Sequence, residues 1–300
     1  MNPPKPRLLI IGASGFVGQH LSRKAVRCFD VFEADLAAPP GESGVAIDIT
    51  SAGSVDAGFQ RTAPDAVILL AGVSDIDQCE ARPDLAEAVN VGGTAHVAEA
   101  CARTGATLLF ISSAAVFDGN KHGYRESDSP TPVSTYGRTK ANAEESIAAT
   151  LPAAVILRLA LVIGFAEGSS TNAMLNKFAA KLRAGETVSL PDFEYRNPID
   201  AATLSDFILE LLCGGGAAGI FHLGASESIS RFELGVRLAE RMGFSSQLVQ
   251  PQTKLLPGRA PRGLDHFLLT EKIRTICGTP VPSCEEVIER AIHGSPKSNS

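Results

Sequence analysis

Leu8-Leu9-Ile10-Ile11-Gly12-Ala13-Ser14-Gly15-Phe16-Val17-Gly18 is the stretch of the chain that decides the predicted fold. Its four consecutive apolar residues are typical of a strand buried on both faces of a parallel sheet. The glycines that follow permit a tight turn, and residues 16–28 have the pattern of a helix. Backbone N–H groups and a helix N-terminus at such a turn attract a phosphate anion. The residues expected to bind the pyrophosphate of a dinucleotide are Gly12, Ser14, Gly15, Phe16, Val17 and Gly18.

Apolar runs alternate with helical patterns through the first half of the chain. The runs are Arg7–Ala13, Asp30–Asp35, Val45–Ile49, Ala66–Gly72 and Ala106–Ser113, and Ala154–Ile163 follows later. The helical patterns are Phe16–Cys28, Ser54–Arg61, Pro83–Thr104 and Ser134–Thr150. Strands and helices that alternate in this way form a parallel sheet with helices on both faces. The sequence therefore predicts an α/β protein with a Rossmann-type doubly wound parallel sheet.

The regular alternation of apolar runs and helical patterns ends after Gly164. Helical patterns and short strands then come with irregular connectors, at Thr171–Ala184, Thr187–Leu190, Ala202–Cys213, Phe221–Leu223 and Arg231–Gly243. We interpret residues 1–163 as an NAD(P)-binding core that about 199–223 complete. Residues 164–198 and 224–293 are expected to form a smaller C-terminal substrate-binding lobe, and 294–300 a disordered tail.

An acidic residue follows the second apolar run at the distance that a dinucleotide site requires. Asp35 can accept hydrogen bonds from the adenosine ribose, whereas a 2′-phosphate would favour Arg or Lys. No Lys or Arg occurs between Arg27 and Arg61, so NAD is favoured and NADP is the alternative. Asp48 and Ile49, after the next strand, are expected near the adenine end. For Asp48 a solvated turn is the competing interpretation.

Three residues have the chemistry and the placement of a proton-transfer site. Tyr136 and Lys140 lie four apart on a predicted helix, so their side chains share one face. An ammonium group near a phenol favours the phenolate and lowers the pKa of that phenol from about 10. Ser113 ends a predicted strand, where ligand-binding residues gather in parallel sheets, and its hydroxyl could orient a carbonyl group.

These motifs together resemble the extended short-chain dehydrogenase/reductases. The resemblance rests on Gly12–Gly18, Asn90–Thr94, Ile111–Phe117, Glu126–Pro132, Tyr136–Lys140, Gly219–Gly224 and Leu264–Ile292. The latter half looks most like the dTDP-4-dehydrorhamnose reductase branch. The resemblance implies that Tyr136 is the acid/base, Lys140 its electrostatic and ribose-binding partner, and Ser113 the residue that orients the carbonyl. The residues implied to line the cofactor channel are Leu70, Ala71, Gly72, Asn90 and Ile111.

Two features of the sequence limit how far the resemblance extends. The reductases of that branch usually have an acid directly after the serine, where this chain has Ala114. Sugar-nucleotide dehydratases need acids nearby for elimination, and Ala114-Ala115 provides none. Residues 112–116 resemble the 4-epimerases instead. Reductase and epimerase both stay open.

The predicted substrate residues are those suited to a nucleotide-sugar diphosphate. Guanidinium groups bind phosphates with two parallel hydrogen bonds. The candidates are Ser74, Ser113, Asn172, Arg196, Arg259 and Arg262. For each arginine and for Asn172, a surface or capping role is the competing interpretation.

Three functional classes compete. The first is an enzyme that transfers a hydride to or from C4 of a nucleotide-activated sugar, with Tyr136 exchanging the proton. Within this class, a nucleotide-sugar 4-epimerase with tightly bound NAD is the alternative to a reductase. The second class acts on another small alcohol or ketone. The third is an NAD(P)-binding regulatory subunit without turnover, like the methionine adenosyltransferase regulatory subunits that this branch also resembles.

Composition disfavours several other classes of protein. A net charge of −6 and scattered basic residues disfavour a nucleic-acid-binding surface. The six cysteines and six histidines lack metal-ligand spacing, so we expect reduced thiols and no metal. The apolar run at Leu8–Ile11 is too short for a signal peptide or a membrane span, which favours a soluble cytoplasmic protein. Helices Pro83–Thr104 and Ser134–Thr150 either pair across a homodimer or serve only the core.

Overall fold

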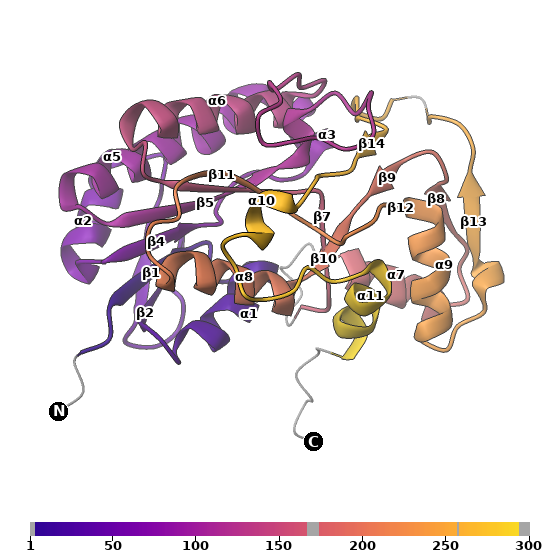
Figure 1. The fold of residues 1–300 in the computed structure, drawn as a ribbon, viewed down its shortest axis with the longest axis horizontal. Coiled ribbons are helices and arrows are strands. Elements are labelled where there is room, and N and C mark those ends of the chain that lie inside the picture. The colour runs from indigo at the N-terminus through magenta and orange to yellow at the C-terminus, as the bar shows by residue number, and fades with distance from the viewer. Residues whose placement is uncertain (1–3, 167–173, 257, 294–300) are drawn as a thin grey trace.

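The computed structural model describes residues 4–166, 174–256 and 258–293. Its centre is a seven-stranded parallel sheet with the strand order β11-β6-β5-β4-β1-β2-β3 (Figure 1). The strands are β1 (Arg7–Ile11), β2 (Asp30–Asp35), β3 (Gly44–Ala46), β4 (Ala66–Leu69), β5 (Thr107–Ser113), β6 (Val155–Leu159) and β11 (Gly219–Leu223). This arrangement confirms the predicted α/β fold with a Rossmann-type sheet.

The alternation of side chains along β1 explains why its sequence is apolar without interruption. Leu8 and Ile10 face one side of the sheet, where they join a core that includes the helices α1 (Phe16–Ala25) and α8 (Ala201–Cys213). Leu9 and Ile11 face the opposite core. The helices on that second side are α2 (Ala52–Thr62), α5 (Thr94–Thr104) and α6 (Thr135–Thr150) (Figure 1). Both faces of β1 are therefore excluded from solvent, as in other doubly wound sheets.

The sheet order reverses at β1, which pairs with β4 on one side and β2 on the other. The helix α1 that follows β1 and the helix α5 that leads from β4 to β5 lie on opposite faces of the sheet, and this opens a crevice at the carboxyl ends of β1 and β4. Ligands of open parallel sheets bind at such a point. The glycine turn and the chain after β4 both lie there.

The smaller elements come mainly from the second half of the chain. Two-stranded and three-stranded sheets pair β7 (Leu161–Ile163) with β10 (Pro198–Asp200), β8 (Val188–Pro191) with β13 (Val249–Gln252), and β9 (Tyr195–Arg196) with both β12 (Ile229–Ser230) and β14 (Asp265–His266). The helices are α7 (Met174–Arg183), α9 (Arg231–Arg241), α10 (Glu271–Arg274) and α11 (Cys284–His293). The exact division of the chain into core and lobe stays a prediction, and the proposed tail 294–300 lies outside the described residues.

Several predicted elements differ from the observed ones by a few residues at their ends, and two are divided into separate elements. The helix expected at Pro83–Thr104 consists of α4 (Pro83–Glu87), a π-helical stretch (Ala88–Gly93) and α5. The turns of the π-helical stretch are wider than those of an α-helix and contain Asn90. Its side chain bonds to Val73, after β4, and to Thr139, in α6. The strand expected at Ala154–Ile163 breaks at Ala160, because β6 pairs within the main sheet whereas β7 pairs with β10 in another sheet.

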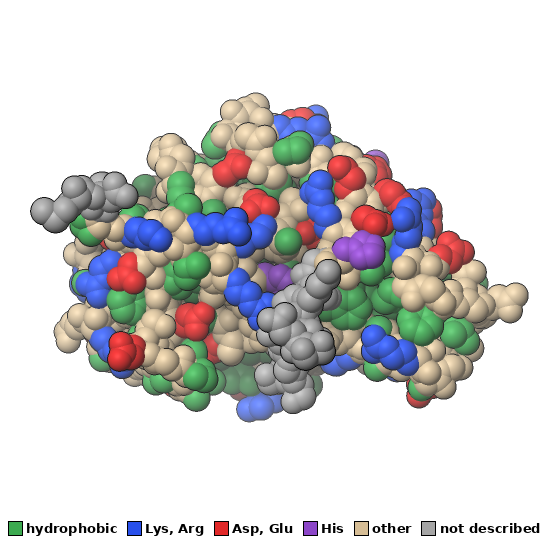
Figure 2. Space-filling view, turned by 90° about the horizontal axis from the view of Figure 1, so that it is seen from below, with side chains coloured by type: hydrophobic (Ala, Val, Ile, Leu, Met, Phe, Trp, Pro, Cys, Tyr) green, Lys and Arg blue, Asp and Glu red, His purple; other side chains and the backbone are tan. Residues whose placement is uncertain are grey.

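The surface carries mixed charge. On the face shown in Figure 2, basic and acidic side chains are interspersed, with hydrophobic side chains scattered among them. Among the described helices, none combines the length and the apolar character that a membrane span needs.

Candidate active site

A cavity of about 860 Å³ opens at the carboxyl ends of the central strands. It extends from the glycine turn after β1, past the ends of β4 and β5, to residues of β9, α9 and β14. Most of the predicted site residues line it: Gly12, Ser14, Gly15, Phe16, Val17, Gly18, Asp35, Asp48, Ile49, Leu70, Ala71, Gly72, Ser74, Ile111, Ser113, Tyr136, Arg196 and Arg262. Lys140, Asn90 and Arg259 lie behind or beside the lining residues, and Asn172 lies outside the described residues.

The glycine turn needs glycine at two positions for different reasons. Gly12 has φ +95°, in the left-handed region, and a Cβ there would meet the backbone nitrogen of Ala71 at 2.7 Å. At Gly18 a Cβ would lie 2.5 Å from the carbonyl oxygens of Gly12 and Ala13. The turn therefore packs directly against the chain after β4 and against the first turn of α1. This part of the cavity wall therefore has no side chain at Gly12 or Gly18.

Asp35 is tied to the glycine turn. Its Oδ2 atom accepts hydrogen bonds from the backbone N–H of Ser14 at 2.8 Å and from the Ser14 hydroxyl at 2.6 Å. Asp48 accepts from the backbone and hydroxyl of Thr50, and these bonds hold the pKa of Asp48 below its usual value. Both carboxylates thus line the cavity in fixed orientations.

Helix α6 is anchored at its first turn, and this places Tyr136 in the cavity. The Ser134 hydroxyl accepts from the Gly137 N–H at 3.1 Å, which caps the helix. The Glu80 carboxylate accepts from both the backbone N–H of Thr135 at 2.6 Å and its hydroxyl at 2.8 Å. The bonds to Glu80 lower the pKa of that carboxyl group. Sequence reasoning missed Glu80, because it precedes its partner by more than fifty positions.

A second contact sets how closely α6 approaches the end of β5. Gly137 lies against the 3₁₀ turn Ala114–Val116, and a Cβ at Gly137 would be only 2.1 Å from the Ala115 carbonyl oxygen. This close approach brings Tyr136 to Ser113, whose Oγ accepts from the Ala115 N–H at 3.1 Å. Burial raises the pKa of Tyr136 to about 12, although its hydrogen bond with Ser113 acts in the lowering direction.

Lys140 is oriented away from the cavity. Its ammonium donates to the Ile111 carbonyl oxygen at 2.7 Å and lies 4.2 Å from the centre of the Phe110 ring. Burial lowers the pKa of Lys140 to about 8, opposed chiefly by the charge of Glu144. We expected the ammonium to lower the pKa of Tyr136. In this structure the effect of burial outweighs any such lowering, so the pKa of Tyr136 is raised on balance.

Asn90 supports the cavity wall from behind. It is 2% exposed, and its Oδ1 accepts from the Val73 N–H at 2.8 Å. Its Nδ2 donates to the Val73 carbonyl oxygen and to the Thr139 hydroxyl, each at 3.0 Å. In this arrangement Asn90 holds the chain after β4 against α6 and does not itself line the cavity.

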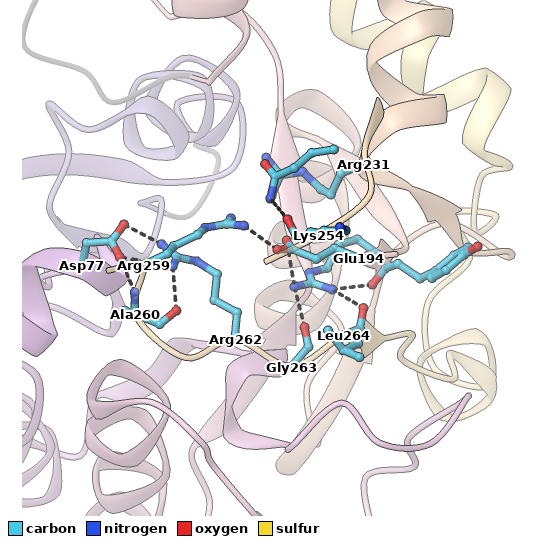
Figure 3. Close-up of polar contacts among 12 residues, drawn as sticks. Asp77, Glu194, Arg231, Lys254, Arg259, Ala260, Arg262, Gly263 and Leu264 are labelled. Atoms are coloured by element: carbon cyan, nitrogen blue, oxygen red, sulfur yellow. Dashed lines mark hydrogen bonds and ion pairs between the residues drawn. The ribbon is translucent and has the colours of Figure 1, made fainter. Parts of the chain in front are cut away.

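An arginine cluster, consisting of Arg196, Arg231, Arg259 and Arg262, lies at the other end of the cavity. Arg196, Arg231 and Arg262 line the cavity there, and Arg259 bonds to the lining residue Glu194. Figure 3 shows Arg231, Arg259 and Arg262 around Glu194. Arg196 is buried and donates to the carbonyl oxygens of Tyr195, Gly263 and Leu264 at 2.6–3.0 Å. Burial lowers the pKa of Arg196 to about 10, so its guanidinium stays charged at neutral pH. Arg231 begins α9 and is partly buried, and desolvation lowers its pKa.

Two carboxylates hold the outer arginines of the cluster. Arg259 donates to Glu194 Oε1 at 2.6 Å. Arg262 donates to Asp77 Oδ2 at 2.7 Å and to Oδ1 at 3.2 Å, and the Ala260 N–H also bonds to Asp77 (Figure 3). Four guanidinium groups and two carboxylates leave a net charge of +2. Sequence reasoning missed Arg231, Glu194 and Asp77, because they come from segments far apart in the chain.

Comparison with known proteins gives consistent results over nearly the whole chain. The family model described as "RmlD substrate binding domain" matches residues 6–295. A dTDP-4-dehydrorhamnose reductase of Mycobacterium tuberculosis is 29% identical over 306 residues, covering 98% of this chain and 95% of the relative. A methionine adenosyltransferase 2 subunit beta of Pongo abelii is 27% identical, covering 87% and 80%. A dTDP-4-dehydrorhamnose reductase of Bacillus anthracis, solved in complex with NADP, superposes with a TM-score of 0.87 at 26% identity, covering 96% and 98%.

Proposed function

The chain belongs to the RmlD substrate binding domain family, and from this premise we propose that it is an NAD(P)H-dependent reductase of a nucleotide-activated 4-keto sugar, similar to dTDP-4-dehydrorhamnose reductases. The observation that carries the proposal is that one cavity unites three parts. These are the glycine turn, Tyr136 beside Ser113, and the arginine cluster. Each part suits a different portion of the two ligands that such a reaction brings together.

The residues of the first part fit a nicotinamide dinucleotide. At Gly12 and Gly18 there is no room for side chains, and the N–H groups in the first turn of α1 would face the pyrophosphate. Asp35, held by Ser14, would accept hydrogen bonds from the adenosine ribose. A carboxylate at that position repels a 2′-phosphate, and we therefore propose that NADH is used in preference to NADPH. When bound, the dinucleotide supplies the hydride.

Tyr136 supplies the proton. As the C4 carbon of the sugar gains the hydride, the carbonyl π electrons move to the oxygen, which takes the phenolic proton of Tyr136. With its pKa raised to about 12, Tyr136 is protonated at neutral pH, as an acid must be. Ser113 donates a second hydrogen bond to the same oxygen. Lys140, on the same face of α6, stabilises the phenolate that forms.

The arginine cluster would bind the diphosphate of the substrate. Its net charge of +2 complements the two negative charges of a sugar-linked diphosphate. Arg196, Arg231 and Arg262 line the cavity, and Arg196 is too deeply buried to serve as an ordinary surface cation. The same residues would have no role with a small uncharged ketone. This favours a nucleotide sugar over other carbonyl substrates.

The test is the oxidation of NADH and, separately, of NADPH against a panel of nucleotide-linked 4-keto sugars, including dTDP-4-dehydrorhamnose. We expect oxidation with one substrate and with NADH preferred, lost in Tyr136→Phe and retained in Tyr195→Phe. Tyr195 is the matched control because the residue is 41% exposed and lies outside the cavity lining. Bound NADH without turnover would refute the proposal and favour an epimerase or a regulatory subunit.

A further inference from the structure

Glu194 contains a carboxylate oxygen that lacks a hydrogen-bond partner in the described structure. The residue is 1% exposed and lines the cavity at the arginine cluster. Its Oε1 accepts from Arg259 (Figure 3). The Arg196 guanidinium lies 3.7 Å from Oε2, too far for a hydrogen bond, and Oε2 has no hydrogen-bond partner among the described residues. A buried acceptor without a donor costs free energy that a fitting ligand would recover.

The negative charge of Glu194 is unexpected in a site that binds only phosphate. A carboxylate beside a diphosphate repels it, so a pure anion site would omit the acid. Asp77, the other acid of the cluster, differs from Glu194 in two ways. Its side chain is 55% exposed, and both of its oxygens accept hydrogen bonds. Glu194 is therefore the acid that is buried among the arginines with acceptor capacity left over.

We propose that Glu194 Oε2 accepts a hydrogen bond from a hydroxyl group of the sugar that is joined to the diphosphate. This inference rests on the proposed function. The sugar ring is bonded directly to the diphosphate, so its hydroxyls lie within a few bonds of the groups that the arginines bind. A ring hydroxyl is a donor, which the four guanidinium groups cannot recognise because they have no acceptor. Glu194 provides the acceptor.

Movement of Arg259 would open the approach to Glu194. Arg259 is 24% exposed, unlike its partner, and it comes from the segment 258–264, which Asp77 holds at Ala260 and Arg262. A bound diphosphate offers Arg259 a second anion at the same end of the cavity. The guanidinium can then turn from Glu194 towards the phosphate, and the carboxylate becomes available to the sugar. The structure thus assigns Glu194 a role in choosing among sugars, beyond the affinity that the arginines provide.

Calorimetric titration with dTDP and with dTDP-L-rhamnose tests this assignment. We expect the wild-type protein to bind the sugar nucleotide at least tenfold more tightly than dTDP, as is typical when a charged group gains a hydrogen bond. Glu194→Gln should abolish this difference and bind dTDP as well as the wild type or better, because a negative charge has left the cluster. UDP and UDP-glucose provide the same comparison if the chain prefers uridine.

Asp77→Asn is the matched control, because it removes the same charge from the same cluster. We expect it to keep the preference for the sugar nucleotide. If Glu194→Gln does not fold, Glu194→Asp replaces it: the charge stays to pair with Arg259, but the carboxylate withdraws by one methylene, and the preference should again fall.

Three results would overturn the assignment, and they can be told apart. If Glu194→Gln keeps the preference for the sugar nucleotide, another group recognises the sugar. If Glu194→Gln loses affinity for dTDP as much as for dTDP-L-rhamnose, Glu194 serves only to position the arginines. If the wild type binds dTDP and dTDP-L-rhamnose equally well, the inference fails while the proposed function stands. Absence of binding to every nucleotide would instead remove the proposed function itself.

Discussion

Arg158 and Glu144 form a buried ion pair with two hydrogen bonds, from Nε to Oε1 at 2.9 Å and from Nη2 to Oε2 at 2.6 Å. Their side chains are 1% and 5% exposed. The Ser112 hydroxyl also donates to Glu144 Oε1. The pair therefore joins β6, α6 and the end of β5, and the last two of these elements carry Tyr136 and Ser113.

Removing one partner of this pair should destabilise the protein strongly. Glu144→Gln leaves the Arg158 guanidinium buried without a counter-ion, and we expect it to lower the free energy of unfolding by about 3–5 kcal/mol. The double variant Glu144→Leu/Arg158→Met removes both charges and should lie much closer to the wild type. Urea denaturation followed by circular dichroism measures both. A loss below about 1 kcal/mol for Glu144→Gln would show that the charges are not buried as described.

Much of the fold was predictable because its determinants are local. The run Leu8–Ile11 is apolar at every position because both faces of β1 are covered, and the glycines at 12 and 18 have no room for a side chain. Such features can be recognised in a short stretch of sequence. Ser113 and Tyr136 were predictable for a related reason, since the end of a strand and the start of a helix have recognisable patterns.

The arginine end of the site was only partly predictable, because long-range pairing builds it. Strands β9, β12 and β14 have two residues each, too few for a periodic pattern. Their pairing brings Glu194, Arg231 and the segment 258–264 together from three separate regions. The orientation of Lys140 towards Ile111 could likewise not be predicted from the sequence, because it depends on how α6 packs against β5.

Replacing Gly137 should move Tyr136 away from Ser113. A Cβ in Gly137→Ala meets the Ala115 carbonyl oxygen, so α6 must move away from the 3₁₀ turn, and Tyr136 with it. We expect kcat to fall at least tenfold, together with a loss of about 1–3 kcal/mol in stability. Steady-state kinetics and urea denaturation measure these effects.

Gly92→Ala is the control for that substitution. Gly92 also lies in a helical stretch, but a Cβ there would meet nothing within 4 Å. We expect unchanged kcat and a stability equal to the wild type or up to about 1 kcal/mol higher, because alanine favours helix more than glycine does. Equal losses in both variants would mean that the contact with Ala115 is unimportant.

Tyr136→Phe should abolish turnover without weakening dinucleotide binding. The phenol acts on the proton of the substrate, whereas the groups that fit the dinucleotide lie at the glycine turn and Asp35. We expect the NADH dissociation constant to change less than threefold. Calorimetry suits this measurement, since the chain contains no tryptophan. A loss of NADH binding as large as the loss of turnover would show that Tyr136 is chiefly a cofactor ligand.

Asp35 should control the choice between the two nicotinamide cofactors. In Asp35→Asn the negative charge that repels a 2′-phosphate is gone, while an amide oxygen can still accept from Ser14. We expect the ratio of kcat/KM for NADH to that for NADPH to fall at least tenfold. Asp48→Asn, a second cavity carboxylate, is the control and should leave this ratio nearly unchanged. A ratio that does not respond to Asp35 would contradict the assigned ribose contact.

The rate of carbonyl reduction should fall above about pH 8. Burial lowers the pKa of Lys140 to about 8, so above that pH the ammonium loses the charge that stabilises the phenolate of Tyr136. In Lys140→Arg the charge persists, and the descending limb of the pH–rate profile should move to higher pH. Lys140→Met should be nearly inactive throughout. A wild-type profile that stays flat to pH 10 would exclude Lys140 as the titrating group.

The place of β11 at the end of the sheet has a consequence for the biosynthesis of the protein. Residues 219–223 cover the outer edge of β6, and α8, which packs on α1, also comes from the second half of the chain. A nascent or truncated chain that stops before Gly219 leaves the backbone of β6 unpaired and apolar side chains uncovered, which invites aggregation. The main sheet is therefore completed late in translation, and an expression fragment that ends after Ile163 should be insoluble.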